Sequence, residues 1–129
     1  MFAPIASSQE TEVWACQGTE ATGIEWQTEE GYRWESTRVT ARDMLLTVDG
    51  INSSYNLDSQ NIPLTCQVVN EASSEKIVSC VRANGLAYDF LVLNPVTGQA
   101  ALSQMGGAIT SNTFYRDLVI TNIFQCTKS

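Results

Sequence analysis

Four cysteines, one near each end of the chain and two in its middle, constrain the fold more than any other feature. The stretch TCQVVNEASSEKIVSCV around the middle pair consists of two β-rich runs on either side of a polar loop, which predicts an antiparallel hairpin. With a loop at residues 71–75, Val68 lies opposite Val78 and Cys66 lies opposite Cys80. Opposite residues in such a hairpin lie about 4.5–5.5 Å apart at Cα, a separation that a disulfide can bridge. We therefore predict a Cys66–Cys80 disulfide.

Cys16 and Cys126 then remain, in the first and the last of the expected strands. A disulfide between them ties the two ends of the chain together. The simplest architecture with neighbouring ends is an antiparallel up-and-down barrel that is closed or nearly closed. The even number of cysteines, without a C-x-x-C pair and without any histidine in the chain, favours disulfides in an exported protein over a zinc or redox site.

Turn residues divide the chain into short β-rich segments, with no internal repeat and no linker. We expect an all-β fold, with one barrel domain of about eight strands over residues 11–129. The expected strands are residues 11–17, 22–28, 32–40, 44–48, 63–70, 76–82, 87–93, 99–104 and 113–126.

The segment GIEWQTEEGYRWES predicts a second hairpin, in which Gly31 is free to take a positive φ in a three-residue loop. This register places Trp26 opposite Trp34 on one face and Glu25 opposite Glu35 on the other. A loop one residue shorter would set Trp26 against Glu35, so the apolar pattern itself selects the register.

The segment FLVLNPVTGQAAL predicts a third hairpin. Asn94 caps the turn with its side chain, Pro95 presets φ at the next position, and Gly98 takes the left-handed conformation. Residues 99–101 then return along residues 91–93. We interpret this stretch as a turn rather than as a binding loop.

Aromatic side chains supply the candidate ligand site. Several of them would share the inner face of the barrel, where large rings either fill the interior or leave room for one small apolar ligand, as in a lipocalin. The candidates are Trp14, Trp26, Tyr32, Trp34, Tyr88 and Phe90.

The chain carries a net charge of −7, and residues 1–35 hold seven glutamates against one arginine. This charge repels phosphate backbones, so nucleic acid is not an expected partner. No apolar run approaches the roughly 20 residues of a membrane-spanning helix, so no membrane insertion is expected. Besides solubility, the acidic segment suggests a surface that steers a basic protein partner. The candidate residues, on the second hairpin, are Glu25, Glu29, Glu30 and Glu35.

The first ten residues, MFAPIASSQE, read as the end of a secretion signal, with the small residues Ala6 and Ser8 before Gln9. We expect residues 1–10 to be a signal-peptide remnant or a disordered N-terminus that lies outside the fold. We expect the protein to be periplasmic or secreted.

Few residues could support catalysis. Without histidine, a nucleophile would need a lysine as its base, and only Lys76 and Lys128 are present, in no recognisable motif. A glycan hydrolase needs only two carboxylates, and Glu25 and Glu35 lie opposite each other in the expected register. They lie on a solvated face, however, without the apolar pocket that raises the pKa of a catalytic acid.

Short Asp/Asn/Gly clusters at residues 49–52 and 56–58 are typical of turns, and neither has the spacing of a calcium-binding EF-hand loop. We expect no catalytic residue, no metal and no cofactor.

The order of the cysteines, glycines and aromatic residues resembles that of small secreted bacterial β proteins, some of which are carried in mobile integron gene cassettes. The resemblance implies a fold class and no activity. It rests on Trp14-x-Cys16-x-Gly18, Gly23, Trp26, the middle cysteine pair, Phe90-Leu-Val-Leu-Asn94-Pro95-x-Thr97-Gly98 and Phe124-x-Cys126.

In size, acidity and disulfide content the chain is also similar to periplasmic lysozyme inhibitors, which are small β-barrels. The S-G-x-x-Y loop of the membrane-lipoprotein type is missing, and Ser53-Ser54-Tyr55 only partly matches it. The lipocalin G-x-W signature is absent too, because Gly23 and Trp26 stand one residue too far apart.

The leading hypothesis is a non-enzymatic exported binding protein of unknown target, with a small apolar ligand in the barrel. The alternatives are an inhibitor of a basic hydrolase such as lysozyme and a small carboxylate-dependent glycan hydrolase. A roomy apolar interior would favour the small ligand, whereas a filled barrel with a protruding acidic hairpin would favour a protein partner.

Overall fold

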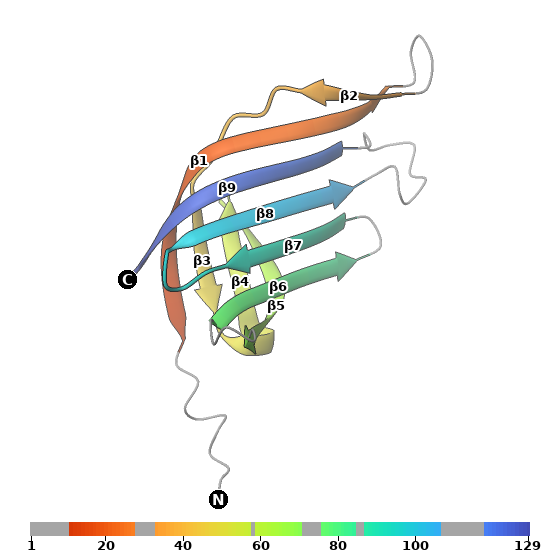
Figure 1. The fold of residues 1–129 in the computed structure, drawn as a ribbon. Helices are drawn as coiled ribbons and strands as arrows, with labels where there is room; N and C mark the ends of the chain where they lie inside the picture. Colours follow the sequence, from red (N-terminus) through yellow and green to blue (C-terminus); the bar gives the residue numbers. More distant parts are fainter. Residues whose placement is uncertain (1–10, 28–32, 58, 71–75, 85–86, 107–117) are drawn as a thin grey trace, which may run out of the picture.

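The computed structural model describes residues 11–27, 33–57, 59–70, 76–84, 87–106 and 118–129, and over these residues the fold is all-β (Figure 1). Eight antiparallel strands close into a barrel, because β1 pairs with β9 along one edge and with β3 along the other. A further strand, β2, pairs with the second half of β1 outside this ring. The expected fold class, with both disulfides, is confirmed.

Strands β6 to β9 run across the front of the barrel in Figure 1, and β3, β4 and β5 cross behind them. A short 3-10 helix, η2 (Gly50–Asn52), connects β3 to β4. The strands are β1 (Glu12–Gln27), β2 (Arg33–Thr37), β3 (Met44–Val48), β4 (Ser53–Leu57), β5 (Gln60–Asn70), β6 (Lys76–Asn84), β7 (Ala87–Leu93), β8 (Gln99–Gly106) and β9 (Leu118–Lys128).

β1 is one long strand where the sequence predicts two short ones, so that prediction is wrong. One edge of β1 pairs with β9 along most of its length, while the other edge pairs first with β3 and then with β2. A β-bulge between Gly18 and Glu20 lies between the β3-paired and β2-paired parts, and such bulges bend a strand. A Cβ at Gly18 would collide with the backbone carbonyl oxygen of Arg42. The glycine marks a close backbone contact and not a turn.

β4 is absent from the predicted strands, because its sequence SSYNL is rich in residues that favour turns. Its inward side chains, Ser53, Tyr55 and Leu57, are nevertheless buried and alternate with more exposed ones. Residues 49–52 do form a turn, in which the N–H of Asn52 donates to the carbonyl oxygen of Asp49 at 2.9 Å. The prediction of a turn at residues 56–58 is wrong for Asn56 and Leu57, which belong to β4.

Both predicted disulfides are present, and each joins residues that lie directly opposite each other on paired strands. Cys66 of β5 faces Cys80 of β6, and Cys16 of β1 faces Cys126 of β9. The second bond lies across the closure of the barrel, as expected from a link between the first and last strands. The predicted register of the β5–β6 hairpin, with Val68 opposite Val78, is also confirmed.

The β7–β8 turn has the predicted chemistry but a different register. The Asn94 side-chain oxygen accepts a hydrogen bond from the N–H of Val96 at 2.9 Å, and Gly98 has a φ of 78°. The N–H of Asn94 bonds the carbonyl oxygen of Gln99, so Leu91 pairs with Leu102, one residue further along than predicted. A slip of one residue exchanges the two faces of a strand, and the observed register puts Leu102 in the core.

Substitution of Gly98 tests this account of the turn. Gly98→Ala is expected to lower the free energy of unfolding by about 1–3 kcal/mol, because the left-handed conformation disfavours a side chain and the added Cβ would crowd the carbonyl oxygen of Cys126. Val96→Ala, at an exposed position of the same turn, is the matched control and should change stability little. Urea unfolding of both variants measures the difference, and equal stability of the two would contradict the account.

Candidate functional site

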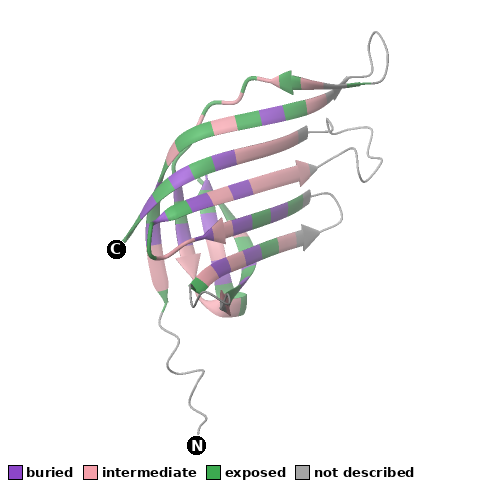
Figure 2. Ribbon diagram, in the orientation of Figure 1, coloured by how far each residue is buried: buried purple, intermediate pink, exposed green. Residues whose placement is uncertain are grey.

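The interior of the barrel is packed with side chains. Every barrel strand contributes two buried apolar or cysteine residues, and these form one cluster, seen as alternating purple segments in Figure 2. Leu46, Leu91, Leu93 and Leu102 have 0% exposure, so no space beside them can hold a water molecule. The core residues are Trp14, Cys16, Met44, Leu46, Tyr55, Leu57, Leu64, Cys66, Val78, Cys80, Leu91, Leu93, Ala100, Leu102, Phe124 and Cys126.

The structure separates the aromatic residues predicted to line the interior. Trp14 is buried inside the barrel, whereas Tyr88 and Phe90 are 38% and 47% exposed on its outside, which corrects their predicted position. The physical reason is strand alternation, because their neighbours Asp89 and Leu91 point inward. Trp26 pairs with Trp34 across β1 and β2, as predicted, but their side chains lie outside the described part of the structure. Tyr32 also lies outside the described residues.

A polar network, which is not predicted from the sequence, crosses one end of the packed interior. The Tyr55 hydroxyl of β4 donates to Asp89 Oδ2 of β7 at 2.7 Å and accepts from Gln104 Nε2 of β8 at 3.1 Å. Arg82 Nε lies 2.9 Å from the same Asp89 oxygen, as an ion pair without hydrogen-bond alignment. One feature of the sequence points to it. Asp89 is two residues before the apolar Leu91 in a strand, so the two side chains lie on the same face.

Burial keeps the Tyr55 hydroxyl protonated. Loss of solvation raises the pKa of Tyr55 above its usual range, and the hydrogen bond to the Asp89 carboxylate raises it further. The phenol therefore stays protonated and serves as a donor. The Asp89 side chain is only 1% exposed while that of Arg82 is 20% exposed, so the network marks the boundary between core and solvent.

Asn122 is a second buried polar residue, one inward row deeper than Gln104 on the neighbouring strand β9. Its side-chain oxygen has no hydrogen-bond partner among the described residues. Asn122 is only 3% exposed and lies beside the fully buried Leu102, its partner across β8 and β9.

The acidic hairpin residues are only partly described. Glu25 pairs with Glu35 across β1 and β2, as predicted. Arg33 Nε donates to Glu35 Oε1 at 2.7 Å, which neutralises part of the local charge. Glu29 and Glu30 lie outside the described residues. The hypotheses that these glutamates steer a basic hydrolase, or act on a glycan, stay predictions.

The outer face of the sheet formed by β6, β7, β8 and β9 carries four of the nine large apolar side chains that are exposed among the described residues. We call the outward positions of these strands, together with Ile24 of β1, the outer face. Among the described residues of β6–β9, none of these positions carries a charged side chain, whereas the adjoining strand β1 carries the exposed Glu20 directly opposite Ile123, at the edge of the face. The outer face comprises Ile24, Ile77, Ser79, Val81, Tyr88, Phe90, Val92, Gln99, Ala101, Ser103, Met105, Val119, Thr121, Ile123, Gln125 and Thr127.

Val81 and Phe90 lie at the centre of the apolar part of this face. They are directly opposite each other across β6 and β7, and they are 48% and 47% exposed. The next pair in the same row, Ser103 and Thr121, is held by a hydrogen bond of 3.0 Å between the two hydroxyls. Tyr88 and Ile123, in the flanking rows, are also exposed.

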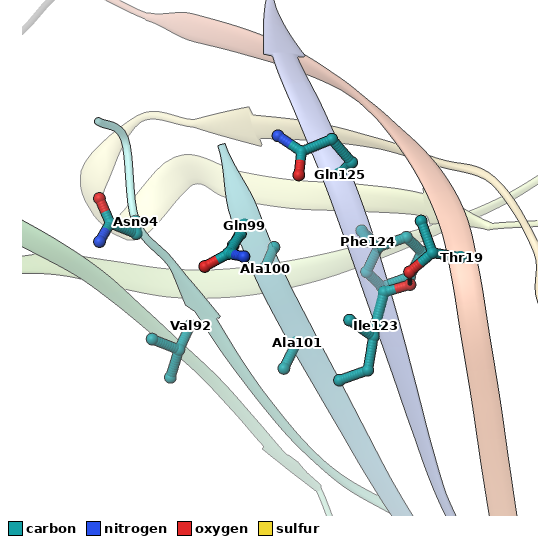
Figure 3. Close-up of a pocket in the computed structure, with 9 residues that line it drawn as sticks. All are labelled: Thr19, Val92, Asn94, Gln99, Ala100, Ala101, Ile123, Phe124 and Gln125. Atoms are coloured by element: carbon teal, nitrogen blue, oxygen red, sulfur yellow. Dashed lines mark hydrogen bonds between the residues drawn. The ribbon is translucent and has the colours of Figure 1, made fainter. Parts of the chain in front are cut away.

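A surface hollow of about 400 Å³ adjoins this apolar patch (Figure 3). Val92, Ala101 and Ile123 supply its apolar side chains. The small side chain of Ala101 leaves space between its larger neighbours. The side-chain amides of Asn94, Gln99 and Gln125, labelled in Figure 3, lie around the hollow. The β7–β8 turn is therefore a hairpin turn whose flanking residues also border the hollow.

The polar groups of the hollow are partly engaged by the fold itself. Gln125 Nε2 donates to the carbonyl oxygen of Thr97 at 2.8 Å, and Thr19 Oγ1 donates to that of Ile123 at 3.2 Å. In the described part of the chain, the side-chain amide of Gln99 makes no such bond, although its backbone N–H donates to Thr97 Oγ1. The hollow therefore keeps uncharged hydrogen-bonding capacity at its rim.

No group of three or more His, Cys, Asp or Glu side chains that could hold a metal ion occurs among the described residues. Within those residues, no helix is long and apolar enough to cross a membrane. Comparison with protein-family models, with curated proteins and with solved structures yields no match to this chain.

Proposed function

We propose that the protein is a non-enzymatic, exported binding protein whose partner is another protein that packs on the outer face. The observation that carries the proposal is the Val81–Phe90 pair, two half-exposed apolar side chains that face each other on β6 and β7, where the described outward positions of β6–β9 carry no charge. Surfaces that lack charge and expose aromatic residues are typical of the cores of protein interfaces.

The packed interior favours a protein partner over the small apolar ligand in the barrel. The leucines at its centre have no open space beside them, so a ligand there would have to displace core side chains. The hollow near Ala101 is open to the surface. Such a shape suits one projecting side chain of a partner better than a small molecule, which usually binds in a cleft that encloses most of its surface.

The proposals of a non-enzymatic role and of export have their own support. The described interior titratable groups Arg82, Asp89 and Tyr55 are engaged with one another, which leaves them a structural role. Two disulfides are typical of proteins that fold in an oxidising compartment, which supports the proposed export to the periplasm or to the outside of the cell.

A photo-crosslinking amino acid tests the outer face as a binding surface. Benzoylphenylalanine in place of Phe90 retains an aromatic side chain and forms a covalent adduct with whatever protein lies against it. In cells that export the protein, irradiation is expected to give a discrete adduct band of higher mass. The measurement is a denaturing gel, followed by mass spectrometry of the linked peptides.

The matched control is the same substitution at Ile51, an apolar residue on η2 that is 79% exposed and lies in the connection between β3 and β4, outside the outer face. Position 51 should give far less adduct than position 90. Equal adducts at both positions, or none at position 90, would contradict the proposed function.

A further inference from the structure

We infer that the protein that covers the outer face is a second copy of this chain, in a two-fold symmetric dimer with the two outer faces packed together. The inference rests on the proposed function, because it identifies the partner of the same face.

Charge is the first argument. Two chains of net charge −7 repel each other, and a contact between them is tolerated best where neither buries a charged group. The described outer-face positions of β6 to β9 meet this condition. A partner for this face needs an uncharged apolar surface, and the chain itself supplies one. A basic partner, by contrast, would meet no acidic side chain at the described outward positions of β6 to β9.

The polar groups on the face are the second argument. Burying a hydroxyl without a hydrogen bond is costly. Ser103 and Thr121 avoid that cost, because their hydroxyls bond each other at 3.0 Å within one copy. The pair can therefore be covered by an apolar surface such as Val81 and Phe90 of a second copy. In a two-fold dimer this contact occurs twice, since each patch serves both copies.

Shape and area are the third argument. The face is formed by adjacent antiparallel strands, and two such sheets pack well face to face at a distance of about 10 Å. The four strands β6 to β9 and three outward rows give an area of roughly 400 Å² per copy, from the usual spacings between strands and residues. A standard stable interface buries about 800 Å² per partner, so this dimer belongs to the weak, micromolar class.

Analytical ultracentrifugation of the purified full chain, between roughly 1 and 300 μM, tests the inference at the concentrations where a micromolar dimer dissociates. The wild-type protein is expected to shift from monomer to dimer across this range. Phe90→Asp is expected to weaken the dimer by at least about 100-fold, because one substitution buries a carboxylate in both copies. Ile51→Asp, which adds the same charge away from the face, should leave dimerisation unchanged.

Phe90→Ser guards against a folding defect. It adds no charge and is expected to weaken the dimer by about tenfold or more, and near-ultraviolet circular dichroism of each variant checks that the barrel is intact. A monomer at every concentration, or a dimer that Phe90→Asp leaves unchanged, would overturn the inference.

The cellular adduct at position 90 separates this failure from failure of the proposed function. An adduct of twice the chain mass supports the dimer. An adduct with a different protein overturns the second-copy inference and leaves the proposed function standing. The absence of any adduct at position 90 removes the proposed function itself.

Discussion

Replacing Cys16 and Cys126 together by alanine is expected to lower the free energy of unfolding by about 4–5 kcal/mol in the chain-entropy account of disulfides. The bond joins residues 110 apart in sequence, so it restrains nearly the whole unfolded chain. It also connects β1 to β9, the pair that closes the barrel. Urea unfolding under non-reducing conditions measures the loss.

The double replacement of Cys66 and Cys80 by alanine is the matched control. These cysteines are just as buried, and they also face each other on neighbouring strands, but their sequence separation is only 14. The same account predicts a loss of about 3 kcal/mol for a loop of this size. If the short bridge proves equally or more important, loop closure is not the main contribution of the long one.

Asp89→Ala is expected to cost about 2–4 kcal/mol, because it leaves the buried Tyr55 hydroxyl without its acceptor and Arg82 without its counter-ion. The figure lies below that for a fully buried ion pair, since the Arg82 side chain is 20% exposed and partly solvated. Thermal and urea unfolding of the variant measure the change.

A double-mutant cycle isolates the pair. If Asp89 and Arg82 interact, the double variant Asp89→Ala, Arg82→Ala should lose clearly less stability than the two single losses combined. Asp89→Asn is the conservative control and should cost less than Asp89→Ala, because an amide oxygen can still accept from Tyr55. Additive single losses would show that the ion pair contributes little.

The hairpins and both disulfides could be predicted because they depend on the alternation of side chains along neighbouring strands. In a short hairpin, the loop length and the alternation of side chains fix which residues face each other, so Cys66 opposite Cys80 and Trp26 opposite Trp34 followed directly. Once one cysteine pair was assigned, Cys16 and Cys126 had to lie together, and the antiparallel barrel followed from that contact.

The predicted strands were wrong where glycine, serine or asparagine, which are common in turns, lie inside a continuous strand. Gly18 suggests a break, yet it is a site where the backbone of Arg42 packs too closely for a side chain. Ser53 and Asn56 suggest a turn, yet they belong to β4, whose buried Tyr55 finds its hydrogen-bond partner 34 residues away in Asp89. No local pattern reveals a partner at that distance.

The sequence alone determined the all-β class, the disulfide pairing and the registers of two hairpins, because each follows from contacts between nearby or covalently linked residues. The tertiary structure decided which face of each strand is inside. Phe90 and Leu91 are both apolar, and local sequence does not say which of them points inward. The closure of eight strands buries Leu91 together with Asp89, and that choice leaves Val81, Tyr88 and Phe90 exposed on the outer face.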